Sequence, residues 1–285
     1  IESIGKKISD TSSNTSLAEV SSKHITSISD IQKPLYSISD RSSKNILLTG
    51  VTGFLGIHVL ASVMDNSDFN VYCSIRNKNG QSAKYRLIDR LNYYFDGKYI
   101  DLVDKRIFVV DSNITDDNFG LSNEEYLSLG NKISDVIHCA ADVRHYGNYN
   151  SSERINITAT DNIIQFCLDF NAVLNHISTM TVSGFGLVRV NYNGVFDEDK
   201  FYINQKYKEN IYVRSKFIAE EEIFRALDKG LLANIYRIGN LTNRFSDYKF
   251  QFNSFENGFM NKLKTIKKLA ILPTYLKDYQ LELTP

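Results

Sequence analysis

Short apolar runs alternate with amphipathic stretches along most of this chain, and the first run is the most informative. Residues 45–49 read NILLT, which has the length and apolarity that a buried parallel strand needs. Gly50, Gly53 and Gly56 follow at three-residue spacing, and the apolar residues after them recur with the period of a helix. The pattern predicts a strand, a tight glycine turn and a helix over residues 45–64.

The same alternation continues through the middle of the chain. It predicts further strands at residues 70–75, 106–110, 135–139, 172–178 and 233–238, and further helices at residues 82–95, 151–170 and 210–227. Strands that alternate with helices indicate an α/β fold, here a Rossmann-type, doubly wound parallel sheet with right-handed crossovers. Beyond about residue 240 this regularity is lost, and one more helix is predicted at residues 256–269.

These changes of pattern divide the chain into three parts. Residues 1–44 contain thirteen serines and no sustained apolar period, which is typical of a linker, although residues 25–36 have enough apolar side chains to dock as a short segment. Residues 45–240 form the predicted nucleotide-binding domain, and residues 241–285 the start of a smaller C-terminal lobe over the carboxyl edge of the sheet. The chain begins with Ile1 and stops after Pro285 without a tail, so we expect a segment of a longer, multidomain polypeptide with a truncated lobe.

Composition narrows the classes of partner. Lysine plus arginine and aspartate plus glutamate both number 33, so nothing predicts a general affinity for nucleic acid or for an anionic membrane. Residues 45–64 lack charged side chains, but three glycines, two threonines and a histidine argue against a membrane span. The three cysteines and five histidines are scattered without metal-ligand spacing. With no signal peptide at the start, this usage predicts reduced thiols, no bound metal and a cytoplasmic location.

The glycine turn is the first candidate site. In a dinucleotide-binding turn, the first glycine permits the tight reversal, the second lets the backbone approach a pyrophosphate, and the third lets the helix pack closely on the strand. The diphosphate would then bind to N–H groups at the positive end of the helix. A G-x-x-G-x-x-G pattern alone is weak evidence, and a glycine-rich loop without a ligand is the alternative.

Two arginines bear on the choice of cofactor. The second strand is followed by Arg76, at the position where an NAD site usually carries an acid for the ribose 2′-hydroxyl and where arginine suits the 2′-phosphate of NADP. Arg86 lies ten residues further on and could complete a phosphate clamp from the next helix. The sequence therefore predicts NADPH, and ordinary solvated charges are the alternative for both arginines.

A tyrosine and a lysine form the candidate catalytic pair. Tyr212 and Lys216 are four residues apart on a predicted helix, so they share one helix face. We expect the ammonium group to lower the tyrosine pKa from its usual value of about 10, so that the phenol exchanges protons near neutral pH. Ser178 and Thr179 stand at the end of the fifth strand, where a hydroxyl could stabilise an oxyanion beside the tyrosine. A chance Y-x-x-x-K is the alternative reading of the pair alone.

Together the motifs TGVTGFLG, Tyr212 with Lys216, and the strand-end Ser178-Thr179 resemble the extended short-chain dehydrogenase/reductase family. More narrowly, the chain is similar to the terminal thioester reductase domains of non-ribosomal peptide synthetases and to the reductase domains of carboxylic acid reductases. The segments that carry this narrower resemblance are VYCSIRNKNGQSAKYRL, VIHCAADVRHYGNY, HISTMTV, NIYVRSKFIAEE, YRIGNLTNRFSD and NSFENGFMNKLKTIKKLAILP. The resemblance covers residues 45–285.

The resemblance implies roles for individual residues. It implies that Thr179 and Tyr212 act on the carbonyl and that Lys216 grips the cofactor ribose. The cofactor-binding residues that it implies are Gly50, Thr52, Gly53, Phe54, Leu55, Gly56, Arg76, Arg86, Asn113, Ala140 and Ala141, together with Tyr212 and Lys216. Two departures stand out: Ser112-Asn113 replaces the usual Gly-Asp, which puts the adenine contact of Asn113 in doubt, and Ala159 stands where a glycine is common.

The function that this resemblance implies is NADPH-dependent release of an acyl or peptidyl chain from the phosphopantetheine thioester of a carrier protein, as an aldehyde or further as an alcohol. The implied partner is an upstream carrier domain, with the serine-rich leader as its tether. A sugar-nucleotide epimerase or dehydratase of the same fold and a catalytically silent NADP-binding sensor are the alternatives. We also expect this piece alone to bind NADPH weakly, to associate or aggregate, and to reduce a thioester poorly.

Overall fold

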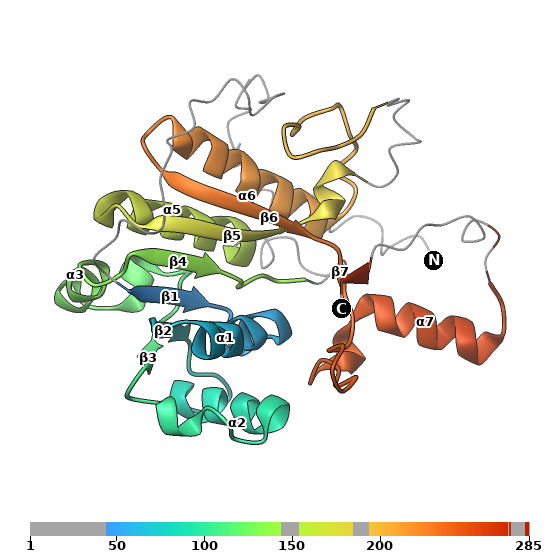
Figure 1. The fold of residues 1–285 in the computed structure, drawn as a ribbon. Helices are drawn as coiled ribbons and strands as arrows, with labels where there is room; N and C mark the ends of the chain where they lie inside the picture. The colour runs from blue at the N-terminus through green and yellow to red at the C-terminus, as the bar shows by residue number, and fades with distance from the viewer. Residues whose placement is uncertain (1–43, 144–153, 185–193, 273, 275–282, 285) are drawn as a thin grey trace, which may run out of the picture.

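A six-stranded parallel sheet forms the centre of the computed structural model, which describes residues 44–143, 154–184, 194–272, 274 and 283–284. The strand order is β3-β2-β1-β4-β5-β6 (Figure 1). The strands are β1 (Asn45–Thr49), β2 (Asn70–Ile75), β3 (Ile107–Asp111), β4 (Asp135–His138), β5 (Val173–Thr179) and β6 (Leu232–Ile238). The order reverses between β1 and β4, which is where a doubly wound sheet opens a crevice for a ligand.

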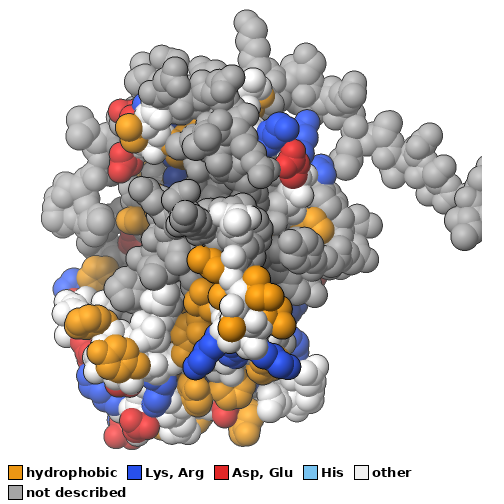
Figure 2. All heavy atoms as spheres, turned by 90° about the vertical axis from the view of Figure 1, so that its right-hand side faces the viewer, with side chains coloured by type: hydrophobic (Ala, Val, Ile, Leu, Met, Phe, Trp, Pro, Cys, Tyr) orange, Lys and Arg blue, Asp and Glu red, His pale blue; other side chains and the backbone are white. Residues whose placement is uncertain are grey.

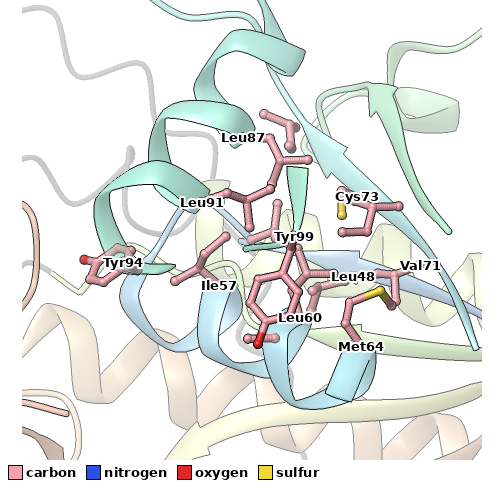
Figure 3. Packing of buried hydrophobic residues seen from close by; sticks show 14 of the residues in the cluster. Leu48, Ile57, Leu60, Met64, Val71, Cys73, Leu87, Leu91, Tyr94 and Tyr99 are labelled. Atoms are coloured by element: carbon pink, nitrogen blue, oxygen red, sulfur yellow. The ribbon is translucent and has the colours of Figure 1, made fainter. Parts of the chain in front are cut away.

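Helices cover both faces of this sheet (Figure 1). One face packs against α1 (Phe54–Asn66) and α2 (Ala83–Phe95), and the other packs against α3 (Asn123–Gly130), α5 (Ala159–Phe170) and α6 (Ile211–Leu227). Alternation along β1 divides its side chains, since Ile46 and Leu48 join the first core and Leu47 joins the second. Figure 3 shows the first core, where Leu60 of α1 and Leu87 of α2 pack over the strands. The predicted doubly wound fold is confirmed.

The element boundaries follow local signals. The side chain of Ser82 caps α2 by accepting a hydrogen bond from the Tyr85 N–H at 3.2 Å, and Asn210 caps α6 in the same way through Val213 at 3.1 Å. β3 begins and ends one residue later than predicted, and β4 ends one residue earlier, at His138. Such shifts are within the ordinary uncertainty of element ends.

Several elements go beyond the sequence prediction. Helix α3 was not predicted, because its sequence, NEEYLSLG, is short and largely polar; a capping box between Ser122 and Glu125 starts it. The predicted helix at 151–170 consists, within the described residues, of a π-helix η5 (Arg154–Thr158) followed by α5. Short 3₁₀ turns complete the connections: η3 (Ile100–Leu102), η4 (Asp117–Gly120), η6 (Met180–Ser183) and η8 (Ser254–Glu256).

The part beyond residue 240 lies on the side toward which the strands point (Figure 1). It contains α7 (Gly258–Leu269) and a two-stranded parallel pair of β7 (Asn240–Leu241) with β8 (Leu283–Thr284). The intervening segment returns to α2, where the Phe252 N–H donates to the Tyr94 hydroxyl at 2.8 Å and the Arg90 guanidinium stacks on the Phe252 ring. Figure 2 shows hydrophobic and basic side chains next to one another on this side of the molecule. The division into domains at residue 240 stays a prediction.

The cysteines, metal-binding groups, membrane spans and linker considered from composition can be compared with the structure. All three cysteines are free, and Cys73 and Cys167 are buried in the cores. Within the described ranges, no group of acidic, histidine or cysteine side chains is arranged to hold a metal ion. No helix in those ranges has both the length and the apolarity required for a membrane crossing. The linker predicted at residues 1–44, with its docking segment at 25–36, lies outside the described residues except for Lys44.

Candidate functional site

The glycine turn after β1 is built by close backbone contacts. Gly50 adopts a φ of +71°, and a Cβ there would lie 2.5 Å from the backbone nitrogen of Ala140. A Cβ on Gly56 would lie 2.3 Å from the Gly50 carbonyl oxygen, so these two positions exclude any side chain. The contact with Ala140 brings the start of the segment after β4 to the glycine turn. The cofactor contacts of Ala140 and Ala141 stay a prediction.

The N-terminus of α1 is open to an anion. Gly53 is the capping residue and supplies no side-chain acceptor, and the first turn holds no acidic residue. Its own N–H donates to the Gly50 carbonyl at 2.9 Å, whereas the N–H groups of Phe54, Leu55 and Gly56 begin the helix and point out of its end. These N–H donors fit a dinucleotide diphosphate, because the neighbouring glycines have no side chain that would keep the diphosphate away from the backbone.

The packing of Gly56 gives a testable prediction. Gly56→Ala is expected to lower the melting temperature by roughly 3 to 10 °C, because relieving the overlap with Gly50 costs about 1–3 kcal/mol. Gly53→Ala is the matched control: its Cβ would meet only the Gly50 carbonyl oxygen, at 3.2 Å, and its φ is −84°. Thermal unfolding without any ligand measures both. Equal melting temperatures for the two variants would contradict this account of the turn.

The two arginines predicted to read a phosphate lie together at the end of β2. The Arg86 guanidinium donates to the backbone carbonyl of Arg76 and, at 3.3 Å, to the Thr52 hydroxyl. Burial lowers the Arg86 pKa, and the neighbouring charges of Arg76 and Arg90 lower it further. The Arg76 side chain is exposed and makes no ion pair with the described residues. The Arg86 guanidinium is held against the Arg76 backbone and is repelled by the Arg76 charge, and two neighbouring positive charges favour an anionic ligand.

Asn113 occupies the predicted place but uses its side chain locally. Its amide donates to the Asp116 carboxylate at 2.8 Å, and its side-chain oxygen accepts from the Thr115 hydroxyl at 3.0 Å. These bonds close the turn after β3. The contact between Asn113 and adenine stays a prediction. To bind adenine, the Asn113 side chain would have to share its amide or its oxygen between the adenine and these local hydrogen bonds.

The candidate catalytic hydroxyls are in contact. Thr179 ends β5 and is 6% exposed, and Tyr212 lies in the first turn of α6. The Thr179 hydroxyl also contacts the Thr181 hydroxyl, at 3.0 Å. Burial raises the Tyr212 pKa, and the interaction with the Thr179 hydroxyl opposes this shift. The tyrosine is therefore a neutral hydrogen-bond donor at neutral pH, at the carboxyl edge of the sheet.

Lys216 corrects one part of the sequence interpretation. We expected its ammonium group to lower the Tyr212 pKa, but Nζ donates to the Ile177 backbone carbonyl at 2.7 Å and the tyrosine pKa is raised instead. Four-residue spacing places two side chains on one helix face without fixing where a long side chain ends. Burial lowers the Lys216 pKa itself to about 8, although the charge of Glu220 opposes that shift.

Sequence reasoning missed several buried polar residues around this site. The Asn156 side chain joins the Asp142 backbone, through bonds of 2.7 and 2.9 Å, to the Ser215 hydroxyl at 2.8 Å, and so ties the segment after β4 to α6. His138 and His176 are fully buried on adjacent strands with ring centroids 5.3 Å apart. Nothing in the spacing of these two histidines along the sequence indicates this pairing.

Comparison with known proteins agrees with this geometry. A family model described as "Male sterility protein" matches residues 48–285. Among solved structures, an archaeal thiolation-reductase di-domain of a non-ribosomal peptide synthetase is 37% identical, with a TM-score of 0.74 over 83% of this chain. The terminal R domain of the myxalamid pathway is 25% identical, with a TM-score of 0.71 over 91% of this chain and 63% of its own.

The similarity extends to curated proteins. L-2-aminoadipate reductase of Saccharomyces cerevisiae is 28% identical over 219 residues, which is 72% of this chain. The chain spans only 16% of the length of that enzyme and 50% of the archaeal di-domain chain. The similarity therefore concerns one part of much longer proteins.

Proposed function

The chain belongs to the male sterility protein family of extended short-chain dehydrogenase/reductases, and from this premise we propose that it is an NADPH-dependent thioester reductase. Its reaction is the release of an acyl or peptidyl chain from a carrier protein as an aldehyde, with reduction to an alcohol where a second hydride is delivered. The resemblance found in the sequence is confirmed at the level of the family.

One observation carries this proposal: the interacting hydroxyls of Thr179 and Tyr212 lie at the sheet edge that also holds the glycine turn. In an open α/β sheet, this edge is where ligands bind. Two neutral hydroxyls there can donate to a carbonyl oxygen as negative charge develops on it. A substrate with a reducible carbonyl group therefore fits these two hydroxyls.

The cofactor site is proposed from the same edge. The open N–H groups at the start of α1 would bind the diphosphate, and Arg76 with Arg86 would bind the 2′-phosphate. Lys216 would turn from the Ile177 carbonyl to the ribose hydroxyls. When bound, NADPH supplies the hydride for the reaction.

The residues of the chain then act on the substrate. Tyr212 and Thr179 hold the thioester oxygen as it becomes negative, and Tyr212 gives its proton to that oxygen. The resulting hemithioacetal returns this proton to Tyr212 as the carbon–sulfur bond breaks. An aldehyde and a thiolate leave, and the thiolate takes a proton from water to give the free thiol. Because burial keeps the Tyr212 pKa high, the tyrosine is in its proton-donating form throughout the neutral range.

We further propose the partner and location of this enzyme. A carrier domain with a phosphopantetheine arm presents the thioester, which agrees with the thiolation domain named for the archaeal relative. The carrier lies upstream in the same multidomain chain, and the reaction takes place in the cytoplasm. Nucleic acid and membrane have no part in this proposal.

The experiment that tests the proposal follows NADPH absorbance with an acyl-pantetheine thioester. The expected result is oxidation of NADPH matched by aldehyde, trapped as an oxime, and by free thiol. Tight binding of NADPH without oxidation would favour the sensor. Oxidation with a sugar nucleotide but not with the thioester would favour the epimerase or dehydratase class.

A further inference from the structure

Helix α6 contacts the end of β5 through three polar side chains, one on each of three successive turns. The Tyr212 hydroxyl interacts with that of Thr179, Lys216 donates to the Ile177 carbonyl at 2.7 Å, and Glu220 accepts from the Ser178 hydroxyl. The helix residues are four apart and share one face of α6, and the strand residues are the last three of β5. Two of the three helix residues belong to the proposed site, and Glu220 is the third.

Glu220 is a fully buried carboxylate with a fixed partner. Its side chain is 0% exposed and pairs with Arg237 of β6, Nη2 to Oε2, at 2.7 Å. Arg237 is the register neighbour of Ser178 in the sheet, and it also donates to the Lys200 carbonyl at 3.0 Å. Removing two charges from water costs free energy, and only such pairing offsets this desolvation cost. Apolar side chains at the same place would avoid the cost, so the fold keeps the buried carboxylate although it adds little stability.

The charges around Lys216 explain what the carboxylate does there. His138 of β4 and His176 of β5 have lowered pKa values, to about 3 for His138, so both rings are neutral at neutral pH. Burial raises the Cys139 pKa to about 12, so this thiol is neutral too. Arg237 on β6 faces the other side of the carboxylate. Among these neighbours, Glu220 is the group whose negative charge favours the ammonium form of Lys216.

We propose that Glu220 is a positioning residue: its buried carboxylate keeps Lys216 charged and fixes the Ser178-Thr179 strand end against α6. Without this carboxylate, the apolar surroundings favour a neutral amine. A neutral lysine loses the charge-assisted part of its hydrogen bonds to the ribose. This inference rests on the proposed function in one respect, which is that Lys216 contacts the cofactor ribose.

The first test needs no cofactor. The Lys216 pKa is about 8 in the folded chain and 10.5 in a model peptide, so between these values the unfolded state binds more protons and stability rises with pH. Urea unfolding of the protein without NADPH, from pH 6 to 10.5, gives this rise; Lys216→Met isolates the part due to Lys216. In Glu220→Gln, the Lys216-dependent rise is expected to begin at a pH lower by about one unit.

Two further variants make this test decisive. Ser178→Ala is the matched control, because it removes the hydrogen bond to Glu220 but keeps the charge, and its rise is expected at the wild-type pH. If Glu220→Gln does not fold with Arg237 unpaired, Glu220→Gln/Arg237→Gln removes both charges and carries the same prediction. An unchanged onset in the variant that folds would overturn the proposal.

The second test connects Glu220 to the cofactor. NADPH affinity, measured by fluorescence from pH 7 to 10, is expected to fall in Glu220→Gln at a pH about one unit lower than in the wild type. A purely structural role would lower the affinity equally at every pH, which would also contradict the proposal. Failure of thioester reduction alone would count against the proposed function and leave both of these measurements intact.

Discussion

Tyr212→Phe is expected to reduce turnover by about a hundredfold or more while NADPH affinity stays nearly unchanged. The structure gives the reason, since the lost hydroxyl is the one that interacts with Thr179, and its raised pKa keeps it a proton donor. A phenylalanine ring preserves the packing but can neither hold the developing oxyanion nor protonate it. Steady-state kinetics with an acyl-pantetheine thioester and a separate NADPH titration measure the two effects.

Tyr202→Phe provides the matched control for this change. Tyr202 precedes α6 in the chain, and its hydroxyl donates to the side-chain oxygen of the nearby Asn204 at 3.1 Å. The same loss of a hydroxyl there is expected to leave turnover within about twofold. Near-normal turnover in Tyr212→Phe would show that Tyr212 does not act on the carbonyl.

Arg76→Ala is expected to weaken NADPH binding about tenfold to a hundredfold and to leave NADH binding unchanged. The loss corresponds to one charge-assisted contact with the 2′-phosphate, worth roughly 1.5 to 3 kcal/mol. Because the Arg76 side chain is exposed, its removal has little effect on stability. Fluorescence titration of both cofactors gives the ratio directly.

Lys78→Ala is the control for net charge. Lys78 is exposed, lies two residues beyond Arg76 in the same loop, and is expected to change the affinity for either cofactor by less than about threefold. Arg86 is unsuitable for this comparison, because it also bonds to the Arg76 carbonyl and to Thr52. An equal loss of NADPH and NADH in Arg76→Ala would assign Arg76 another role.

The fold was predictable because its signals are local. The NILLT run with its three glycines fixes β1, the turn and the start of α1, and the predicted bounds of β1 and β2 agree with the structure. The missed α3 lacks an apolar period, so only its Ser122–Glu125 capping box marks it in the sequence. Apolar residues that recur with the helical period indicate a buried helix face, and a short, largely polar helix has too few of them to show this pattern.

The site was predictable only in part, because spacing places residues but not the ends of long side chains. The four-residue separation of Tyr212 and Lys216 correctly indicated a shared face, yet Lys216 reaches the strand and not the phenol. The Glu220–Arg237 pair joins residues from α6 and β6 and depends on the sheet register. Contacts of this kind can be identified only from a structure, because they depend on which strands pair and in which register.

The central claim is that hydride passes to the carbonyl carbon of a carrier-bound thioester. The most direct test gives the full-length protein a loaded carrier and NADPH deuterated at the transferable position of the nicotinamide, and analyses the trapped aldehyde by mass spectrometry. The account predicts a single deuterium at the aldehyde carbon, delivered from one face of the nicotinamide only and lost when the Thr179–Tyr212 pair is removed. An aldehyde without deuterium, or an intact thioester after prolonged incubation with bound NADPH, would contradict it.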